Sequence, residues 1–321
     1  MQRIQIVGAG GIGCAVGYAL CAGGLDVLFV DANDRKVQWG NANGVGVEGR
    51  ASLPARFTPF ASWAPGHDAM VVLCTKCYCN AAVLARVPAT ATIIPIQNGF
   101  DPDLEERCHA LEGIASFVSE CDRERPVTRI TRRGKLFFGS RSNGSLCGET
   151  SFTDQLRRTN LFSFTPVENI LPYKYTKLMY NAAISPLAAT AGIDNGELLR
   201  HPRARRLFFR LLAENFRILR EAGVPMERIG PFHPSTVAGI LQLWPIASLL
   251  ARAFYPTLKG TYCSMSNDLP AGHTEIENYN GHLIQLAAGR PCPLNKQVHA
   301  LVKRMERDRI PPSLDLLDEL D

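Results

Sequence analysis

Near its start the chain reads IQIVGAGGIG over residues 4–13. The apolar run at the front of this segment is followed at once by glycines, and a helix-compatible stretch, Cys14–Ala22, comes next and ends at Gly23-Gly24. A second apolar run rich in β-forming residues, Val27–Val30, then ends at Asp31. Strand, glycine turn, helix and strand in this order predict a βαβ unit of a parallel sheet.

The glycine spacing matches the dinucleotide-binding fingerprint G-x-G-x-x-G at Gly8, Gly10 and Gly13. Gly8 permits the tight turn, Gly10 lets the backbone approach a pyrophosphate, and Gly13 allows the helix to pack closely on the strand. Gly11 opens the helix whose N-terminus would face the phosphates. Asp31 closes the second strand, where a carboxylate binds ribose hydroxyls and repels a 2′-phosphate. We therefore expect NAD(H), with NADP(H) as the alternative, unless Asp31 only caps the following turn.

The two halves of the chain differ in their patterns. Apolar runs predict further strands at 69–74, 92–96, 136–139 and 161–165, with a polar, proline-containing segment at 52–66 between the first strands. From about Asn169 onward helical periodicity replaces the strand signals, and the predicted helices are 175–191, 202–222, 234–253, 273–288 and 296–307. We expect an α/β Rossmann-type domain over residues 1–168, followed by an all-α domain over residues 169–321 that carries substrate-binding and catalytic residues.

Composition excludes several classes of protein. The 321 residues are 46% apolar and 20% charged, which is ordinary for a globular chain and excludes a disordered or fibrous one. The formal charge of +5 suits an anionic small molecule but is too dispersed for nucleic-acid binding. No apolar run is long enough to predict a membrane span. The ten cysteines are scattered and Cys74-x-x-Cys77 has no second pair, so we expect reduced thiols, no metal site and a cytoplasmic location.

Polar side chains recur at positions that favour a binding site. Lys76 and Asn98 each follow an apolar strand, and the carboxyl ends of parallel strands form the ligand-binding edge of open α/β sheets. Lys177, Asn181 and Ser185 are spaced four residues apart, so they share one face of a predicted helix whose other positions are largely apolar. We interpret both sets as lining a cleft. The alternatives are a solvated lysine, an Asn-Gly turn and a solvent-facing stripe.

Taken in order, these motifs resemble the ketopantoate reductase (2-dehydropantoate 2-reductase) family over almost the whole chain. The matching pieces after the glycine turn are Lys76, Gln97-Asn98-Gly99, Lys177-Leu178-x-x-Asn181, Glu214 to Ala222-Gly223, Ser264-Met265-x-x-Asp268, His273-Thr274-Glu275-Ile276, Asn280-Gly281 and Pro293-Leu294-Asn295. The resemblance implies a Rossmann domain followed by a helical domain, with the active site between them. It also implies hydride transfer from a nicotinamide cofactor to a 2-oxo acid, the step from ketopantoate to pantoate in pantothenate biosynthesis.

The same resemblance assigns roles to individual residues. Lys177 would be the proton donor, and Glu275 would hydrogen-bond the reacting oxygen. Lys76 and Asn98 would line the nicotinamide and substrate side. The residues that would contact the substrate are Asn98, Asn181, Ser185 and Ser264. An apolar cleft would lower the pKa of Lys177, and the Glu275 carboxylate would oppose that shift.

Two positions depart from the family pattern and leave other functions open. Family members usually use NADPH and carry a basic residue where this chain has Asp31, and a second asparagine where it has Ser185. One alternative is therefore an NAD-dependent D-2-hydroxyacid dehydrogenase on the same scaffold. An alternative of another class is a catalytically inactive nucleotide-binding regulator. The presence of both Lys177 and Glu275 argues against this alternative. The expected partner is a small 2-oxo acid, and the chain is expected to be a monomer or homodimer.

Overall fold

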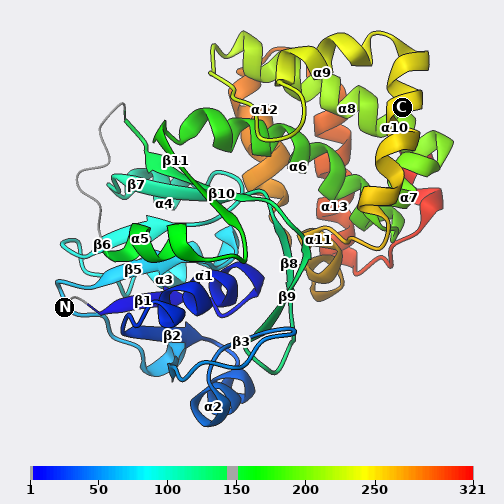
Figure 1. The fold of residues 1–321 in the computed structure, drawn as a ribbon. Coiled ribbons are helices and arrows are strands. Elements are labelled where there is room, and N and C mark those ends of the chain that lie inside the picture. Colours follow the sequence, from blue (N-terminus) through cyan, green and yellow to red (C-terminus); the bar gives the residue numbers. More distant parts are fainter. Residues whose placement is uncertain (1–2, 143–150, 321) are drawn as a thin grey trace. The chain divides into compact units, whose positions relative to one another are not determined.

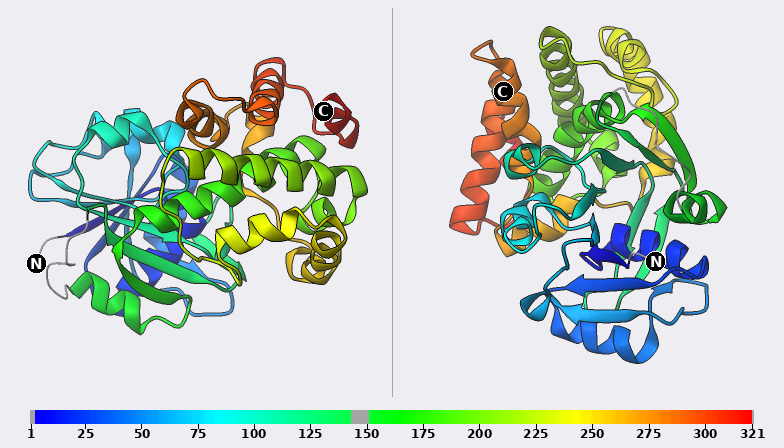
Figure 2. Two further views of the ribbon diagram at one scale, coloured as in Figure 1. Left: turned by 90° about the horizontal axis from the view of Figure 1, so that it is seen from above. Right: turned by 90° about the vertical axis from the view of Figure 1, so that its left-hand side faces the viewer.

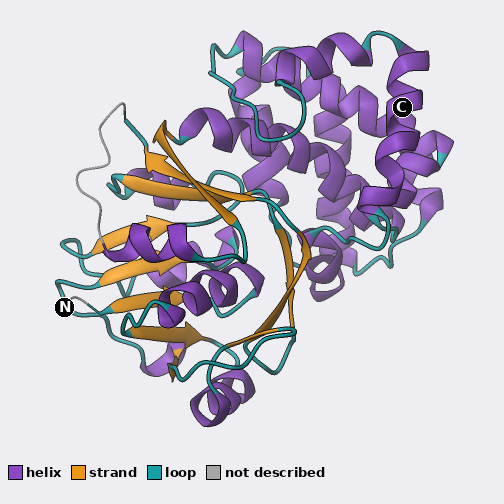
Figure 3. Ribbon diagram, viewed as in Figure 1, coloured by secondary structure: helices purple, strands orange, loops and turns teal. Residues whose placement is uncertain are grey.

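The computed structural model describes residues 3–142 and 151–320. It divides into two compact units, residues 1–170 and 171–321. Figure 3 shows that the strands belong to the first unit and that the described part of the second unit is helical. The predicted fold class, a Rossmann-type α/β domain followed by an all-α domain, is confirmed.

The first unit is built on a parallel sheet of five strands in the order β4-β2-β1-β5-β6 (Figure 1). The strands are β1 (Ile4–Val7), β2 (Val27–Asp31), β4 (Arg56–Pro59), β5 (Met70–Leu73) and β6 (Thr92–Pro95). Successive side chains enter two different cores, Ile6 and Phe29 on one face and Val7 and Val30 on the other. Because both faces are covered, the central strands β1, β2 and β5 are largely apolar rather than alternating, whereas the edge strand β4 is more polar.

The helices of this unit are α1 (Gly11–Ala22), α2 (Asp34–Asn43), α3 (Asn80–Leu84), α4 (Pro102–Glu106) and α5 (Ser151–Arg158), with 3-10 turns η1 (Phe60–Ser62) and η2 (Cys77–Cys79). Helices α1 and α5 lie side by side (Figure 1). Helix α1 begins at Gly11, three residues before the predicted start at Cys14, and so includes the end of the glycine turn.

Two smaller sheets complete the first unit. One has the order β11-β10-β7, with β7 (Leu111–Ala115), β10 (Lys135–Ser140) and β11 (Ser163–Asn169). The other has the order β3-β9-β8, with β3 (Gly46–Val47), β8 (Val118–Cys121) and β9 (Val127–Arg132), and it packs against α1. The expected strands near 136–139 and 161–165 correspond to β10 and β11. The sequence did not predict β3, β4, β7, β8 and β9; β4 lies inside the segment interpreted as a polar separator, and every residue of β8 is half-buried, so neither shows a strong apolar run.

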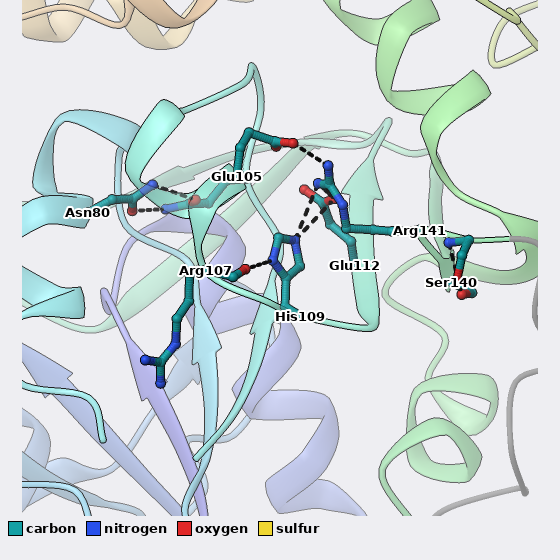
Figure 4. A network of polar contacts seen from close by, with 9 residues as sticks. Asn80, Glu105, Arg107, His109, Glu112, Ser140 and Arg141 are labelled. Carbon is teal, nitrogen blue, oxygen red and sulfur yellow. Dashed lines mark hydrogen bonds and ion pairs between the residues drawn. The ribbon is translucent and has the colours of Figure 1, made fainter. Parts of the chain in front are cut away.

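A buried charge network ties β7 and the residue after β10 to α4 (Figure 4). The Arg141 guanidinium donates through Nη1 to Glu112 Oε2 at 2.7 Å, and Glu112 is fully buried. Nη2 of Arg141 donates to Glu105, and His109 Nε2 lies 3.7 Å from Glu112 Oε2. The carboxylate of Glu112 is therefore desolvated and relies on Arg141 for its counter-charge.

The second unit contains the helices α6 (Leu171–Ala191), α7 (Asn195–Arg200), α8 (Pro202–Glu221), α9 (Pro234–Leu241), α10 (Trp244–Leu258), α11 (Ser264–Asp268), α12 (His282–Ala287) and α13 (Pro293–Asp308). Shorter turns are η3 (Leu269–Ala271), the π-helix η4 (Glu277–Gly281) and η5 (Leu314–Glu319). Helix α6 packs along α8, as the views of Figure 2 show.

Two predicted helices differ from the structure. The single helix expected at 234–253 is a pair, α9 and α10, bent by 119° at the break. Pro245, in the first turn of α10, is the sequence signal for that new start. The helix expected at 273–288 is a π-helix at 277–281 followed by the short α12. No single described helix is long and apolar enough to cross a membrane, and only the bent α9–α10 pair reaches that length and composition.

Candidate functional site

The glycine turn between β1 and α1 has the geometry that a dinucleotide requires. Gly8 has φ +98°, and a Cβ there would lie 2.9 Å from the backbone of Cys74 and Thr75. At Gly13 a Cβ would lie 2.0 Å from the Gly8 carbonyl oxygen, so only glycine lets α1 pack this closely. At Gly10 a Cβ would meet nothing within 4 Å, which leaves the backbone open to a ligand. These are the positions to which the fingerprint assigns a tight turn, close helix packing and an approach to the pyrophosphate.

The residues around Gly11 also fit a phosphate. Helix α1 starts without a side-chain cap, so its first backbone N–H groups have no capping oxygen from its own N-cap residue. The Ser119 hydroxyl is buried and has no hydrogen-bond partner among the described residues, and it lies 2.7 Å from the point where a Gly11 Cβ would stand. An unsatisfied hydroxyl beside a helix N-terminus suits a phosphate oxygen.

Asp31 supports the glycine turn directly. Its Oδ2 accepts the Ala9 backbone N–H at 2.8 Å, and its Oδ1 accepts the Asn33 N–H at 2.9 Å. The turn-capping interpretation of Asp31 therefore describes part of what the residue does. A carboxylate has about four acceptor positions, so these two bonds leave capacity for ribose hydroxyls.

The strand-end residues Lys76 and Asn98 follow β5 and β6, which are neighbours in the sheet. The Gln97 side chain joins the two strand ends because its Nε2 donates to the Thr75 carbonyl at 2.9 Å. The Cys77 thiol donates to the Asn98 carbonyl at 3.0 Å, which fixes the loop that follows Lys76 against the loop that holds Asn98. Both predicted residues are half-buried at one edge of the sheet.

In the second unit, α6 carries the polar row. Lys177 and Asn181 are half-buried, and Ser185 is 4% exposed. The Cys263 thiol donates to the Ser185 carbonyl at 3.3 Å, and Cys263 immediately precedes α11. Ser264, the first residue of α11, is thereby held against the helix that presents the polar row.

Glu275 is buried, with 3% of its surface exposed, and its Oε2 accepts the Tyr279 hydroxyl at 3.1 Å. Tyr279 is itself fully buried and belongs to η4, which packs against α6. The sequence analysis did not identify Tyr279; its only local signal is the four-residue separation from Glu275. A buried tyrosine hydroxyl that donates to one oxygen orients the carboxylate.

Hydrogen bonds link the side-chain amides of three asparagines, Asn215, Asn280 and Asn295. Each of the three residues is 0% exposed. Asn280 Nδ2 donates to Asn295 Oδ1, Asn295 Nδ2 donates to Asn215 Oδ1, and each bond is 2.9 Å long. Asn215 Nδ2 then donates to the Met179 carbonyl at 3.0 Å, and Glu214 accepts the Asn295 N–H at 2.8 Å. Three family motifs that had no assigned role therefore meet in one network.

The network repairs a defect in α6. Pro186 lies inside this helix and has no N–H, so the Ala182 carbonyl loses its ordinary donor four residues on. Asn280 Nδ2 donates to that carbonyl at 2.9 Å. The side-chain amide thus replaces the missing backbone bond on the helix that carries Lys177 and Asn181.

Replacing Asn280 by alanine is expected to lower the free energy of unfolding of the second unit by about 1–3 kcal/mol, because the buried Ala182 carbonyl loses its donor. In a Pro186→Ala background the loss should be smaller, since the alanine N–H can bond Ala182. Thermal unfolding of the parent, Asn280→Ala, Pro186→Ala and the double variant measures the coupling energy between the two positions. Equal losses in both backgrounds would contradict the replacement argument.

We expect His282 to make the stability of the second unit depend on pH. Burial, followed by the positive charge of Lys174, lowers the pKa of His282 from 6.5 to about 4. The unfolded chain therefore takes up a proton below 6.5 while the folded imidazole remains neutral, so stability should fall as the pH falls from 6.5 towards 4 and level off below. The difference in melting temperature between the parent and His282→Gln should shrink across this window. If the melting temperatures of the two proteins changed in parallel with pH, His282 would be excluded as the cause of the pH dependence.

The remaining candidate reactive groups are possible metal ligands, the cysteines and a buried lysine. Among the described residues no cluster of three or more His, Cys, Asp or Glu side chains is arranged to hold a metal ion. The nine described cysteines are free thiols, and Cys147 lies outside the described residues. Lys36 is only 7% exposed, and its Nζ donates to the Ala9 carbonyl at 3.1 Å, an inward orientation that the sequence did not indicate.

The structure defines a chain with a Rossmann-type α/β domain followed by a helical domain. Residues 4–142 match the family model described as "Ketopantoate reductase PanE/ApbA", and residues 169–306 match "Ketopantoate reductase PanE/ApbA C terminal". The chain belongs to the ketopantoate reductase family.

Known proteins agree with this assignment. The 2-dehydropantoate 2-reductase of Pyrococcus horikoshii is 26% identical, over 95% of this chain and 98% of its own length. A PanE/ApbA family ketopantoate reductase from Ralstonia eutropha JMP134 superposes with a TM-score of 0.74 at 21% identity, covering 96% of this chain and 99% of that one. A D-mandelate dehydrogenase solved with NADH and anilino(oxo)acetate superposes with a TM-score of 0.77 at 18% identity, with the same coverage of 96% and 99%. The last two likenesses concern the fold.

Proposed function

We propose that this protein reduces the ketone of a 2-oxo acid with a nicotinamide cofactor, and that ketopantoate, the precursor of pantoate in pantothenate biosynthesis, is its first candidate substrate. One observation carries the proposal. Helix α11, which begins with Ser264, and the π-helix η4, whose Tyr279 orients Glu275, both pack on the helix that carries Lys177 and Asn181. These are the residue types that bind and protonate a 2-oxo acid.

Each unit has its own task. In the first, Gly8, Gly10 and Gly13 shape the turn, and Asp31 holds it by accepting the Ala9 N–H. When bound there, the reduced nicotinamide supplies the hydride. Lys76 and Asn98 stand at the sheet edge where open α/β sheets bind ligands.

The second unit handles the substrate and the proton. Lys177 donates a proton to the alkoxide oxygen as it forms, a role that an ammonium within hydrogen-bond reach can fill. Glu275, with Tyr279 bonded to its Oε2, accepts a hydrogen bond from the same region of the substrate. The amide of Asn181 and the hydroxyls of Ser185 and Ser264 hold the substrate carboxylate and hydroxyl.

Asp31 supports NADH over NADPH. A carboxylate at the end of β2 repels a 2′-phosphate, and the Arg35 guanidinium, which would attract one, is 76% exposed and paired with Glu124. Two unit charges about 4 Å apart in water interact by about 1 kcal/mol, so a preference of about fivefold or more is expected.

A second candidate is an NAD-dependent D-2-hydroxyacid dehydrogenase. Ser185 favours it, because a short hydroxyl replaces the longer asparagine of the family in a position that is 4% exposed, and the extra space suits a bulkier substrate. Asp31 favours it too, through the preference for NADH.

The test is a spectrophotometric screen of ketopantoate and of branched and aromatic 2-oxo acids, each with NADH and with NADPH. Fastest oxidation of NADH with ketopantoate supports the first candidate, and a preference for an aromatic or branched acid supports the second. A flat response with every acid, from a protein that still binds NADH, would favour the nucleotide-binding regulator and overturn both.

A further inference from the structure

Three side chains converge on one carbonyl of the glycine turn. The Ala9 oxygen accepts hydrogen bonds from the Cys14 thiol at 3.3 Å, from the Cys121 thiol at 3.4 Å and from Lys36 Nζ at 3.1 Å. The neighbouring N–H of the same residue is the one bonded to Asp31. Together these contacts fix both backbone polar groups of Ala9, the residue between Gly8 and Gly10.

The two sulfur atoms are in contact. Cys14 Sγ and Cys121 Sγ lie 3.9 Å apart, although the residues are 107 positions apart in the chain. Cys14 lies inside α1 and is fully buried, whereas Cys121 ends β8 and is half-buried, so a small oxidant reaches Cys121 first. Lys36 Nζ lies 3.7 Å from Cys121 Sγ.

The surroundings give the two thiols different roles. A hydrogen bond from Cys14 and the positive charge of Lys36 hold the pKa of Cys121 below its ordinary value, against the effect of burial. Burial and the adjacent Cys121 raise the pKa of Cys14 well above its ordinary value. The more accessible thiol with Lys36 Nζ beside it, Cys121, therefore suits the nucleophile, and the fully buried Cys14 suits the resolving thiol.

We propose that Cys14 and Cys121 form an oxidisable dithiol site beneath the glycine turn, which a hydroperoxide converts to a reversible disulfide. With hydrogen peroxide as the oxidant, the Cys121 thiolate attacks one oxygen and the O–O bond breaks. The products are a sulfenic acid and a hydroxide ion, which is protonated to water. The Cys14 thiol then attacks the sulfenic sulfur, an S–S bond forms, and water leaves. Two thiols and one peroxide give one disulfide and two waters, and a dithiol reductant reverses the oxidation.

The disulfide would reduce the number of hydrogen bonds that the Ala9 carbonyl accepts. Both S–H donors are lost, and Lys36 alone remains bonded to it. The bond also ties α1 to β8 beside Gly10. The second part of the proposal, which rests on the proposed function, is that oxidation weakens NADH binding by about threefold or more, in keeping with two lost hydrogen bonds.

The first experiment treats the full chain with hydrogen peroxide, blocks the remaining thiols with N-ethylmaleimide and maps peptides by mass spectrometry. The expected product is a Cys14–Cys121 disulfide that dithiothreitol reduces.

Cys121→Ser should abolish this disulfide, and Lys36→Met should slow its formation by about threefold or more, since the charge that favours the thiolate is lost. Cys21→Ser is the matched control, because Cys21 lies on the same helix and burial raises its pKa to about 12, so linkage should form at the parental rate. Alkylation of both Cys14 and Cys121 after oxidation would overturn the site.

The second experiment measures NADH binding by fluorescence titration of the reduced and oxidised chain and of oxidised Cys121→Ser. A weaker NADH affinity only in the protein with the Cys14–Cys121 disulfide supports the proposal that the disulfide alters the glycine turn. Equal NADH affinities in all three proteins would overturn this second part of the proposal. A chain that forms the linkage but binds NADH in neither state would instead contradict the proposed function and leave the dithiol site standing.

Discussion

Replacing Lys177 with alanine is expected to lower turnover of the best 2-oxo acid by about 10²–10⁴-fold, the usual contribution of a positioned general acid. NADH affinity should be nearly unchanged, because the glycine turn that would bind the dinucleotide belongs to the other unit of the chain. Steady-state kinetics and NADH titration of the purified variant measure the two effects separately.

Lys296→Ala is the matched control for this experiment, since Lys296 is an exposed lysine of the same unit and lies outside the proposed site. It should retain parental turnover. A Lys177→Ala variant with unchanged turnover would remove Lys177 from the role of proton donor, whereas a variant that loses NADH binding would point to a fold defect.

Replacing Glu112 with alanine is expected to produce the largest loss of stability in the first unit, about 3 kcal/mol, because it removes a buried counter-charge. Of the two carboxylates that Arg141 contacts here, only Glu105 would remain, and its side chain is 34% exposed. Urea unfolding followed by tryptophan fluorescence measures the loss. In a Trp244→Phe background the remaining tryptophans, Trp39 and Trp63, both report on the first unit.

Glu105→Ala provides the comparison, because an exposed ion pair contributes less than about 1 kcal/mol. Its unfolding midpoint should lie close to that of the parent. If Glu112→Ala shifted the midpoint no further than Glu105→Ala, the buried pair in Figure 4 would not be a main support of this unit.

The sequence predicted those parts of the fold whose signals are local. The run from Ile4 to Asp31 contains strand, turn, helix and strand in one short segment, so spacing alone identified it. Strands such as β8 were missed because their residues are half-buried on both faces and show no apolar run. The break before α10 had a signal in Pro245, but the apolar periodicity on either side obscured it.

The candidate site divides in the same way. Motif residues such as Lys177 and Asn98 could be named from their positions at strand ends and along one helix. The partnerships behind them could not, because Asn280 reaches a carbonyl 98 residues away and Asn295 reaches Asn215 across 80 residues. The π-helix η4 contains Asn280, which makes two of these distant contacts, and the sequence of its five residues did not predict it.

The hydrogen bond from the Ala9 N–H to Asp31 constrains any attempt to change the coenzyme preference that we propose for this chain. An arginine at position 31 would attract the extra phosphate of NADPH, but it would leave the Ala9 N–H of the glycine turn without its acceptor. Asp31→Asn removes the negative charge and keeps one acceptor oxygen for the Ala9 N–H, while the Asn33 N–H then faces an amide nitrogen and loses its acceptor. A designer would therefore start from asparagine, and would add basic groups on the neighbouring loop rather than at position 31 itself.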